Sequence, residues 1–149
     1  MRIPNIEHTV YIETPLEKVF QTLTTSEGWD AWFTNGTEID LKPGGHIRLR
    51  WKNFGVGHYT TEDGGKILAI IPNEKFSFQW SPASAPTTVT FNLEKLGSGT
   101  KVSLTESGYS TSDKDLEALV GCAVGWGEAL TLLKVYLEHK VIYGEVPNN

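Results

Sequence analysis

Hydrophobic and polar residues alternate one by one over much of this chain, which is the pattern of a β-strand with one buried face. The alternation first appears over residues 5–13, where Ile6, His8 and Val10 share one side. It returns in four later segments, HIRLRW (46–51), KFSFQW (75–80), TVTFNL (88–93) and KVSLTE (101–106). The segment KILAIIP (66–72) is apolar at both parities, which predicts a strand covered on both faces.

Apolar residues three and four positions apart predict two short helices after the first strand. The segment TPLEKVFQTLTT (14–25) opens with Thr14, Pro15 and Glu17, the arrangement of a capping box with proline in the first turn. We therefore expect Thr14 to be the N-cap of the first helix. A second short helix is expected to begin at Ser26.

Short segments between the strands contain the glycine or asparagine that tight turns use. They are KPGG (42–45), EDGG (62–65), IPNE (71–74) and GSGT (97–100). Because no crossover helices separate the later strands, the sheet is expected to be antiparallel, with the helices gathered on one face. The predicted class is α+β, in a single domain over residues 1–149.

The longest predicted helix runs from residue 112 or 113 to about residue 139 and contains three glycines in seven residues. Glycine inside a helix costs roughly 1 kcal/mol relative to alanine. At ~100° per residue, one apolar stripe contains Leu116, Leu119, Val120, Ala123, Trp126, Gly127, Leu130, Leu133 and Leu137. Gly121 and Gly125 lie on roughly the opposite side. The glycines indicate either close packing or room for a ligand, and Gly127 is the one expected to face the sheet.

The order and spacing of these segments resemble the START-like (Bet v 1-like, SRPBCC) superfamily. The likeness covers nearly the whole chain and rests on YIETPLEKVFQTLTTSEGWDAWF, a following GG, GKILAIIPNEKFSFQW, VTFNLEKLGSGTKVSLTESGY and GWGEALTLLKVYLE. Within the superfamily, the chain is similar to the bacterial branch that resembles the C-terminal domain of the ATPase activator of the ninety-kilodalton heat-shock protein. The resemblance implies a helix-grip fold, in which a curved antiparallel sheet of about seven strands wraps the long C-terminal helix.

The resemblance also implies a mostly apolar cavity between the sheet and this helix. Aromatic rings with few polar groups line small-molecule pockets, although they also fill ordinary cores. On the implied fold we expect the cavity to be lined by Trp32, Phe33, Trp51, Phe78, Trp80, Phe91, Glu106, Trp126, Gly127 and Leu130. Trp32 and Phe33 are expected at its mouth.

Two polar residues, His8 and Glu106, occupy apolar positions of predicted strands. The helix-grip fold makes the first and last strands neighbours, so these two side chains are expected to face the cavity side by side. A buried polar group left without a partner costs about 1–3 kcal/mol. The two residues are therefore interpreted either as a satisfied buried pair or as a ligand anchor or acid/base pair.

Charge, cysteine content and motifs exclude several functions. The net charge is −5 and the basic residues are dispersed, which argues against a nucleic-acid partner. Cys122 is the single cysteine, so neither an intramolecular disulfide nor a cysteine-based zinc site is expected. The sequence contains no metal-binding or cofactor motif, so we expect neither group. No signal peptide and no membrane span are recognised, which predicts a cytoplasmic protein.

Three functions remain open at this point. The first is the binding of a small hydrophobic or amphipathic molecule between sheet and helix. The second is a protein-interaction role that modulates a chaperone ATPase. The third is an enzyme of the cyclase or hydratase kind, with His8 and Glu106 as acid/base candidates. Nothing in the sequence requires catalysis, so a binding role is favoured, and both a monomer and a homodimer are compatible with it.

Overall fold

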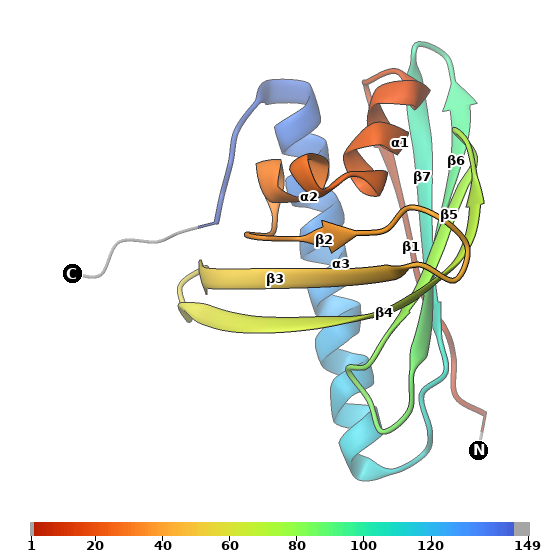
Figure 1. Ribbon diagram of the computed structural model, residues 1–149, viewed down its shortest axis with the longest axis vertical. Helices are drawn as coiled ribbons and strands as arrows, with labels where there is room; N and C mark the ends of the chain where they lie inside the picture. Colours follow the sequence, from red (N-terminus) through yellow and green to blue (C-terminus); the bar gives the residue numbers. More distant parts are fainter. Residues whose placement is uncertain (1, 145–149) are drawn as a thin grey trace.

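The structure, a computed structural model, describes residues 2–144, which form a seven-stranded sheet and three helices (Figure 1). In chain order the elements are β1 (Ile6–Ile12), α1 (Leu16–Thr24), α2 (Ser26–Trp32), β2 (Glu38–Ile39), β3 (His46–Phe54), β4 (Tyr59–Ile71), β5 (Lys75–Trp80), β6 (Thr87–Leu96), β7 (Gly99–Ser107) and α3 (Asp113–His139). The predicted α+β class and helix-grip arrangement are confirmed.

The sheet follows the order β1-β7-β6-β5-β4-β3-β2, and its neighbouring strands are antiparallel. The first and last strands are therefore neighbours, with Ile6 opposite Glu106 and His8 opposite Leu104. In Figure 1, β1, β5, β6 and β7 run alongside α3, whereas the β3–β4 hairpin swings across the helix. The sheet thus approaches α3 from two directions.

This change of direction occurs inside β4, which pairs with β3 over its first half and with β5 over its second. Gly64 and Gly65 lie at the change of partner. A Cβ atom at Gly64 would lie 2.1 Å from the Ile47 carbonyl oxygen, and one at Gly65 would lie 2.3 Å from the Gln79 carbonyl oxygen. Only glycine permits this close approach of backbones. The turn predicted at EDGG is therefore wrong, because these glycines bend a continuous strand and the hairpin turn lies at residues 55–58.

The first short helix begins without the predicted cap. Pro15 occupies the N-cap position of α1 and makes no side-chain capping hydrogen bond. Thr14 instead donates its backbone N–H to the Ile12 carbonyl oxygen at 2.8 Å, at the end of β1. The capping box predicted from Thr14 and Glu17 is wrong because Thr14 lies in the turn that follows β1, one residue before the N-cap position. The second helix begins at Ser26, as predicted.

The buried face of α3 is narrower than the predicted stripe. Trp126, Leu130 and Leu133 are buried against the sheet, but Val120 is 65% exposed.

The side of the sheet that faces away from α3 carries apolar side chains, since Leu68 of β4 is 40% exposed. The prediction that KILAIIP is covered on both faces is therefore wrong, because the helices pack on one face of the sheet.

Within residues 2–144, α3 is the one helix long and apolar enough to cross a bilayer by length and composition, with a mean hydropathy of 1.4 over an 18-residue window. The core helix of a globular domain passes the same test. In this structure, the face of α3 that contains Trp126 packs against the sheet as part of the core.

Candidate ligand-binding groove

A groove lies between the middle of α3 and the β3–β4 hairpin. Its main part has a volume of about 520 Å³, and an inner extension holds about 200 Å³. Phe33, Trp51, Trp80 and Gly125 line both parts, so the two adjoin. The main part is completed by Phe54, Tyr59, Thr61, Glu62, Asp63, Ser81, Glu128 and Leu132, and the inner part by Gly121, Cys122 and Trp126. Ligand sites in proteins commonly measure about 300–1,000 Å³.

One side of the groove is an aromatic wall, formed by Phe33, Trp51, Trp80 and Trp126. Phe33 meets Trp51 edge to face with ring centroids 5.4 Å apart. The next two neighbours follow at 6.5 Å, Trp51 to Trp80, and at 5.4 Å, Trp80 to Trp126. Such ring pairs each contribute about 0.5–1.5 kcal/mol beyond their buried area. The wall is therefore held in place before any ligand arrives.

Two of the three glycines of α3 open onto this groove. A Cβ atom at Gly121 or at Gly125 would have no atom of residues 2–144 within 4 Å, and both residues line the inner part. The two positions are four residues apart, so they lie one above the other on the same helix face. The absence of side chains at these glycines leaves space between α3 and the aromatic wall.

Gly127 faces the sheet, as expected, and the side chain that it meets there belongs to β1. A Cβ atom there would lie 3.2 Å from the His8 imidazole ring. The His8 Nε2 atom donates a hydrogen bond to the Ala123 carbonyl oxygen at 2.8 Å, which holds the ring against the helix. Gly127 therefore makes room for the His8 ring.

Glu106 is fully buried behind the aromatic wall, with no exposed surface. Its Oε2 accepts hydrogen bonds from Trp80 Nε1 at 2.7 Å and from Thr87 Oγ1 at 2.6 Å. Its Oε1 accepts one from Trp126 Nε1 at 3.0 Å. Within residues 2–144 no hydrogen bond or ion pair joins Glu106 to His8. Glu106 thus fixes the orientation of two rings of the wall, and it lies outside the groove lining.

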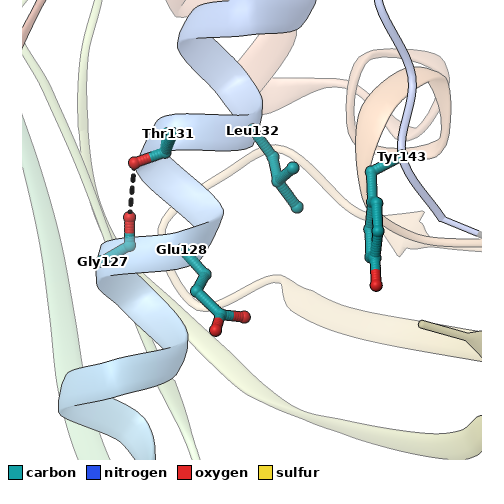
Figure 2. A pocket seen from close by; sticks show the side chains of 5 residues that line it. All are labelled: Gly127, Glu128, Thr131, Leu132 and Tyr143. Atoms are coloured by element: carbon teal, nitrogen blue, oxygen red, sulfur yellow. Dashed lines mark hydrogen bonds between the residues drawn. The ribbon is translucent and has the colours of Figure 1, made fainter. Parts of the chain in front are cut away.

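A second, outer pocket of about 440 Å³ adjoins the groove on the other side of Glu128 and Leu132, which line both spaces. Figure 2 shows Tyr143 facing these two residues across the pocket. Tyr143 reaches this position because the chain after α3 folds back onto the hairpin. Its ring packs edge to face on Phe54, with centroids 5.6 Å apart, and the Gly55 N–H donates to the carbonyl oxygen of the next residue, Gly144, at 2.6 Å.

Cys122 is the one thiol of the chain and lies at the inner end of the groove. Burial raises the pKa of this thiol above its ordinary value, although the neighbouring Tyr109 hydroxyl acts in the opposite direction. Burial, and after it the contact with Cys122, raises the pKa of Tyr109. Both groups are therefore protonated at neutral pH, and the thiol has little of the thiolate character that a nucleophile needs.

The residues predicted for the cavity fall into three groups. Phe33, Trp51, Trp80 and Trp126 line the groove. Gly127 borders the outer pocket, while its missing side chain accommodates His8. Trp32, Phe78, Phe91, Glu106 and Leu130 are buried in the core. Strand alternation identifies inward-facing side chains, but it does not say which of them other side chains cover.

Several groove residues were missed by the sequence reasoning. They are Phe54, Tyr59, Gly121, Gly125, Glu128 and Leu132, which lie on the hairpin tip and on the helix face opposite the predicted stripe. A signal existed for Gly121 and Gly125, since two glycines one turn apart on a helix leave an uncovered strip of backbone. The presence of Phe54 and Tyr59 in the groove depends on the path of β3 and β4, which the sequence pattern does not show.

The bent antiparallel sheet, the gripped C-terminal helix and the groove between them define a START-like helix-grip protein. Residues 13–138 match the model of the family described as Activator of Hsp90 ATPase homolog 1-like protein. The chain belongs to this family. No curated protein matches the sequence.

Solved structures show the same fold. The solution structure of the Aha1 dimer from Colwellia psychrerythraea is similar, with 29% identity, a TM-score of 0.74, and 92% of this chain and 98% of that chain covered. Protein SSP2350 from Staphylococcus saprophyticus has 26% identity and a TM-score of 0.76, with 96% and 98% covered. Protein MLL2253 from Mesorhizobium loti, at 19% identity and a TM-score of 0.76, with 93% and 100% covered, shows the fold alone.

Proposed function

We propose that this protein binds a small hydrophobic or amphipathic molecule in the groove between α3 and the β3–β4 hairpin. The observation that carries the proposal is the pair of glycines at Gly121 and Gly125, which face open space opposite the aromatic wall. A helix that needed only to pack would gain roughly 1 kcal/mol from alanine at each position. The retained space, lined by large rings, supports a binding role.

The experiment is native mass spectrometry of freshly purified protein, followed by denaturing extraction of any bound molecule. We expect a stoichiometric ligand in the unaltered protein and none in Gly125→Leu, whose side chain fills the space beside the wall. The same substitution should raise the free energy of unfolding by about 0.5–1 kcal/mol, because leucine is the better helix former. Loss of ligand together with a gain in stability would show that the leucine fills the groove, because a damaged fold would lose stability as well as ligand.

The matched control is Val124→Leu, which changes the adjacent exposed residue outside the groove lining. It should keep the ligand at the level of the unaltered protein. An unaltered protein that carries no ligand and retains none from a panel of lipids and aromatic compounds would contradict the proposal. The glycines would then serve packing alone.

A second candidate function is interaction with a chaperone ATPase, which the family description suggests. One surface feature favours a protein partner. Val120 and Val124, one turn apart on α3 beside the groove mouth, are 65% and 60% exposed. Such paired apolar side chains are available to a partner protein or to a second copy of the chain.

The acid/base alternative gains no support from the geometry. The His8 Nε2 atom donates a hydrogen bond to a carbonyl oxygen of α3. Both carboxyl oxygens of Glu106 accept hydrogen bonds, from three donors in all, behind the wall. Neither residue lines the groove. A general acid or base must reach the proton that it transfers, directly or through one water.

A further inference from the structure

Within residues 2–144, the groove is lined by aromatic rings and carboxylates and by no Lys, Arg or His. We propose that it selects organic cations, namely a protonated or quaternary amine attached to an aromatic or aliphatic body. This inference rests on the proposed binding function and adds the charge of the ligand to it. Three carboxylates line the groove, those of Glu62, Asp63 and Glu128, and their partners differ.

The first lining carboxylate, Glu62, is already paired. Arg50 donates its Nε–H to Glu62 Oε2 at 2.7 Å, and this hydrogen bond holds the pKa of the Glu62 carboxyl below its ordinary value. Arg50 also pairs with Glu38, with 2.6 Å between nitrogen and oxygen. The charge of Glu62 is therefore largely compensated and does not decide the selectivity.

The other two lining carboxylates have no cationic partner within residues 2–144. Asp63 accepts backbone N–H groups only, from Gly64 at 2.7 Å and from Ser81 at 3.0 Å. Glu128 forms neither a hydrogen bond nor an ion pair in this part of the chain. Figure 2 shows its side chain extending away from α3 into the space beside Leu132. A cationic ligand would supply the missing partner.

The aromatic wall adds to this preference. The faces of indole and phenyl rings carry negative electrostatic potential and attract ammonium groups within about 6 Å. Trp80 and Trp126 direct their N–H edges to the buried Glu106, so these donors are turned away from a ligand. Within residues 2–144, the carboxyl group of Glu106 behind the rings likewise accepts hydrogen bonds from neutral donors and has no cationic partner.

An anionic ligand has little to bind in the same groove. Its carboxylate or phosphate would lie near Asp63 and Glu128, and within residues 2–144 the cations Arg50 and Lys52 line a neighbouring depression and not the groove itself. A neutral ligand would keep the contact with the rings but would leave both carboxylates unpaired. The order of affinity expected for ligands of equal size is therefore cation, neutral molecule, anion.

The test uses three ligands with one ring system, 2-naphthylmethylamine, 2-naphthylmethanol and 2-naphthoate, titrated at pH 7 and low salt and followed by calorimetry. At this pH the amine is a cation and the acid is an anion. We expect the amine to bind roughly fivefold more tightly than the alcohol, and the acid to bind most weakly. The preference for the amine should shrink in high salt.

Glu128→Gln should reduce the affinity for the amine at least about threefold and leave the affinity for the alcohol unchanged. Glu117→Gln is the matched control, since Glu117 is exposed on the same helix and lies outside the groove lining. Equal affinity for all three ligands would overturn the inference and leave the binding function standing. Failure of the amine to bind would overturn the inference, and the binding function would be overturned only if the extraction experiment also finds no ligand.

Discussion

Glu106 shows how one residue organises a site that it does not enter. Its two oxygens accept hydrogen bonds from two indole N–H groups, of Trp80 and Trp126, and from the Thr87 hydroxyl. The chain supplies neutral donors to this buried carboxylate, and three donors would be unsatisfied without it. The aromatic wall therefore depends on Glu106 for its orientation.

Replacing Glu106 with leucine should lower the free energy of unfolding by about 3–5 kcal/mol, because three buried donors lose their acceptor and each costs about 1–3 kcal/mol. Urea denaturation measures the loss, and near-ultraviolet circular dichroism reports the changed packing of the tryptophans. Glu106→Gln should cost less, because its amide oxygen still accepts. Glu94→Gln, an exposed change on β6, is the control and should unfold like the unaltered protein. A leucine variant of unchanged stability would show that the hydrogen bonds contribute nothing.

At the scale of the element, the N-terminal end of α3 is anchored by a buried carboxylate. Asp115 accepts the Ser110 N–H at 2.8 Å, the Ser84 N–H at 2.9 Å and the Ser84 hydroxyl at 3.0 Å. The hydrogen bonds from Ser110, followed by those from Ser84, hold the pKa of Asp115 well below its ordinary value. These bonds tie the helix to the loops after β5 and β7.

This arrangement predicts a pH dependence of stability. The unfolded chain takes up a proton at Asp115 near pH ~4, whereas the folded protein resists protonation. The contribution to stability is therefore complete above about pH 4 and is lost as the pH falls through the lower folded-state pKa. Asp115→Asn should be less stable than the unaltered protein at pH 7, and its stability should fall less between pH 7 and pH 3. Urea unfolding at both pH values measures this.

The control for this prediction is Asp113→Asn, a change in the same helical turn at an exposed carboxylate. It should keep the acid sensitivity of the unaltered protein. If Asp115→Asn loses as much stability on acidification as the unaltered protein does, the acid sensitivity comes from other carboxylates and the anchor is not its source.

At the scale of the whole molecule, groove and exposed surface lie side by side on α3. Gly121 and Gly125 face the groove, whereas Val120 and Val124 face outward. Binding of a small ligand would therefore involve Gly121 and Gly125, whereas contact with a protein partner would involve the neighbouring Val120 and Val124. Substitutions on the two faces can separate the two candidate functions.

If the chain stimulates a ninety-kilodalton chaperone, we expect Val124→Lys to abolish that stimulation, because a charge enters an apolar contact, and to leave ligand retention unchanged. Gly125→Leu should have the opposite effects. The measurements are the ATPase rate of the chaperone from the same organism and the extraction of bound ligand. A chaperone whose rate does not respond to the unaltered protein would rule out the second function.

The family resemblance implied the pairing of the first and last strands, and the sequence pattern by itself determined the fold class, the start of α2 and the bounds of α3. These features depend on local patterns and on order along the chain, such as the alternation in β5 and the helical spacing that continues to His139. The identity of inward-facing rings such as Trp51 and Trp80 also followed, because alternation fixes the side of the strand on which each ring lies.

Only the tertiary structure decided where space remains. The same Gly-Gly pair suits a turn or a bend, and the partners of β4 on either side made it a bend at Gly64. That bend carries the hairpin across α3, opposite Gly125, whereas β1 brings His8 against Gly127. Helical periodicity placed Gly127 toward the sheet, but whether a glycine faces a ring or a groove depends on elements distant in sequence, which periodicity alone does not reveal.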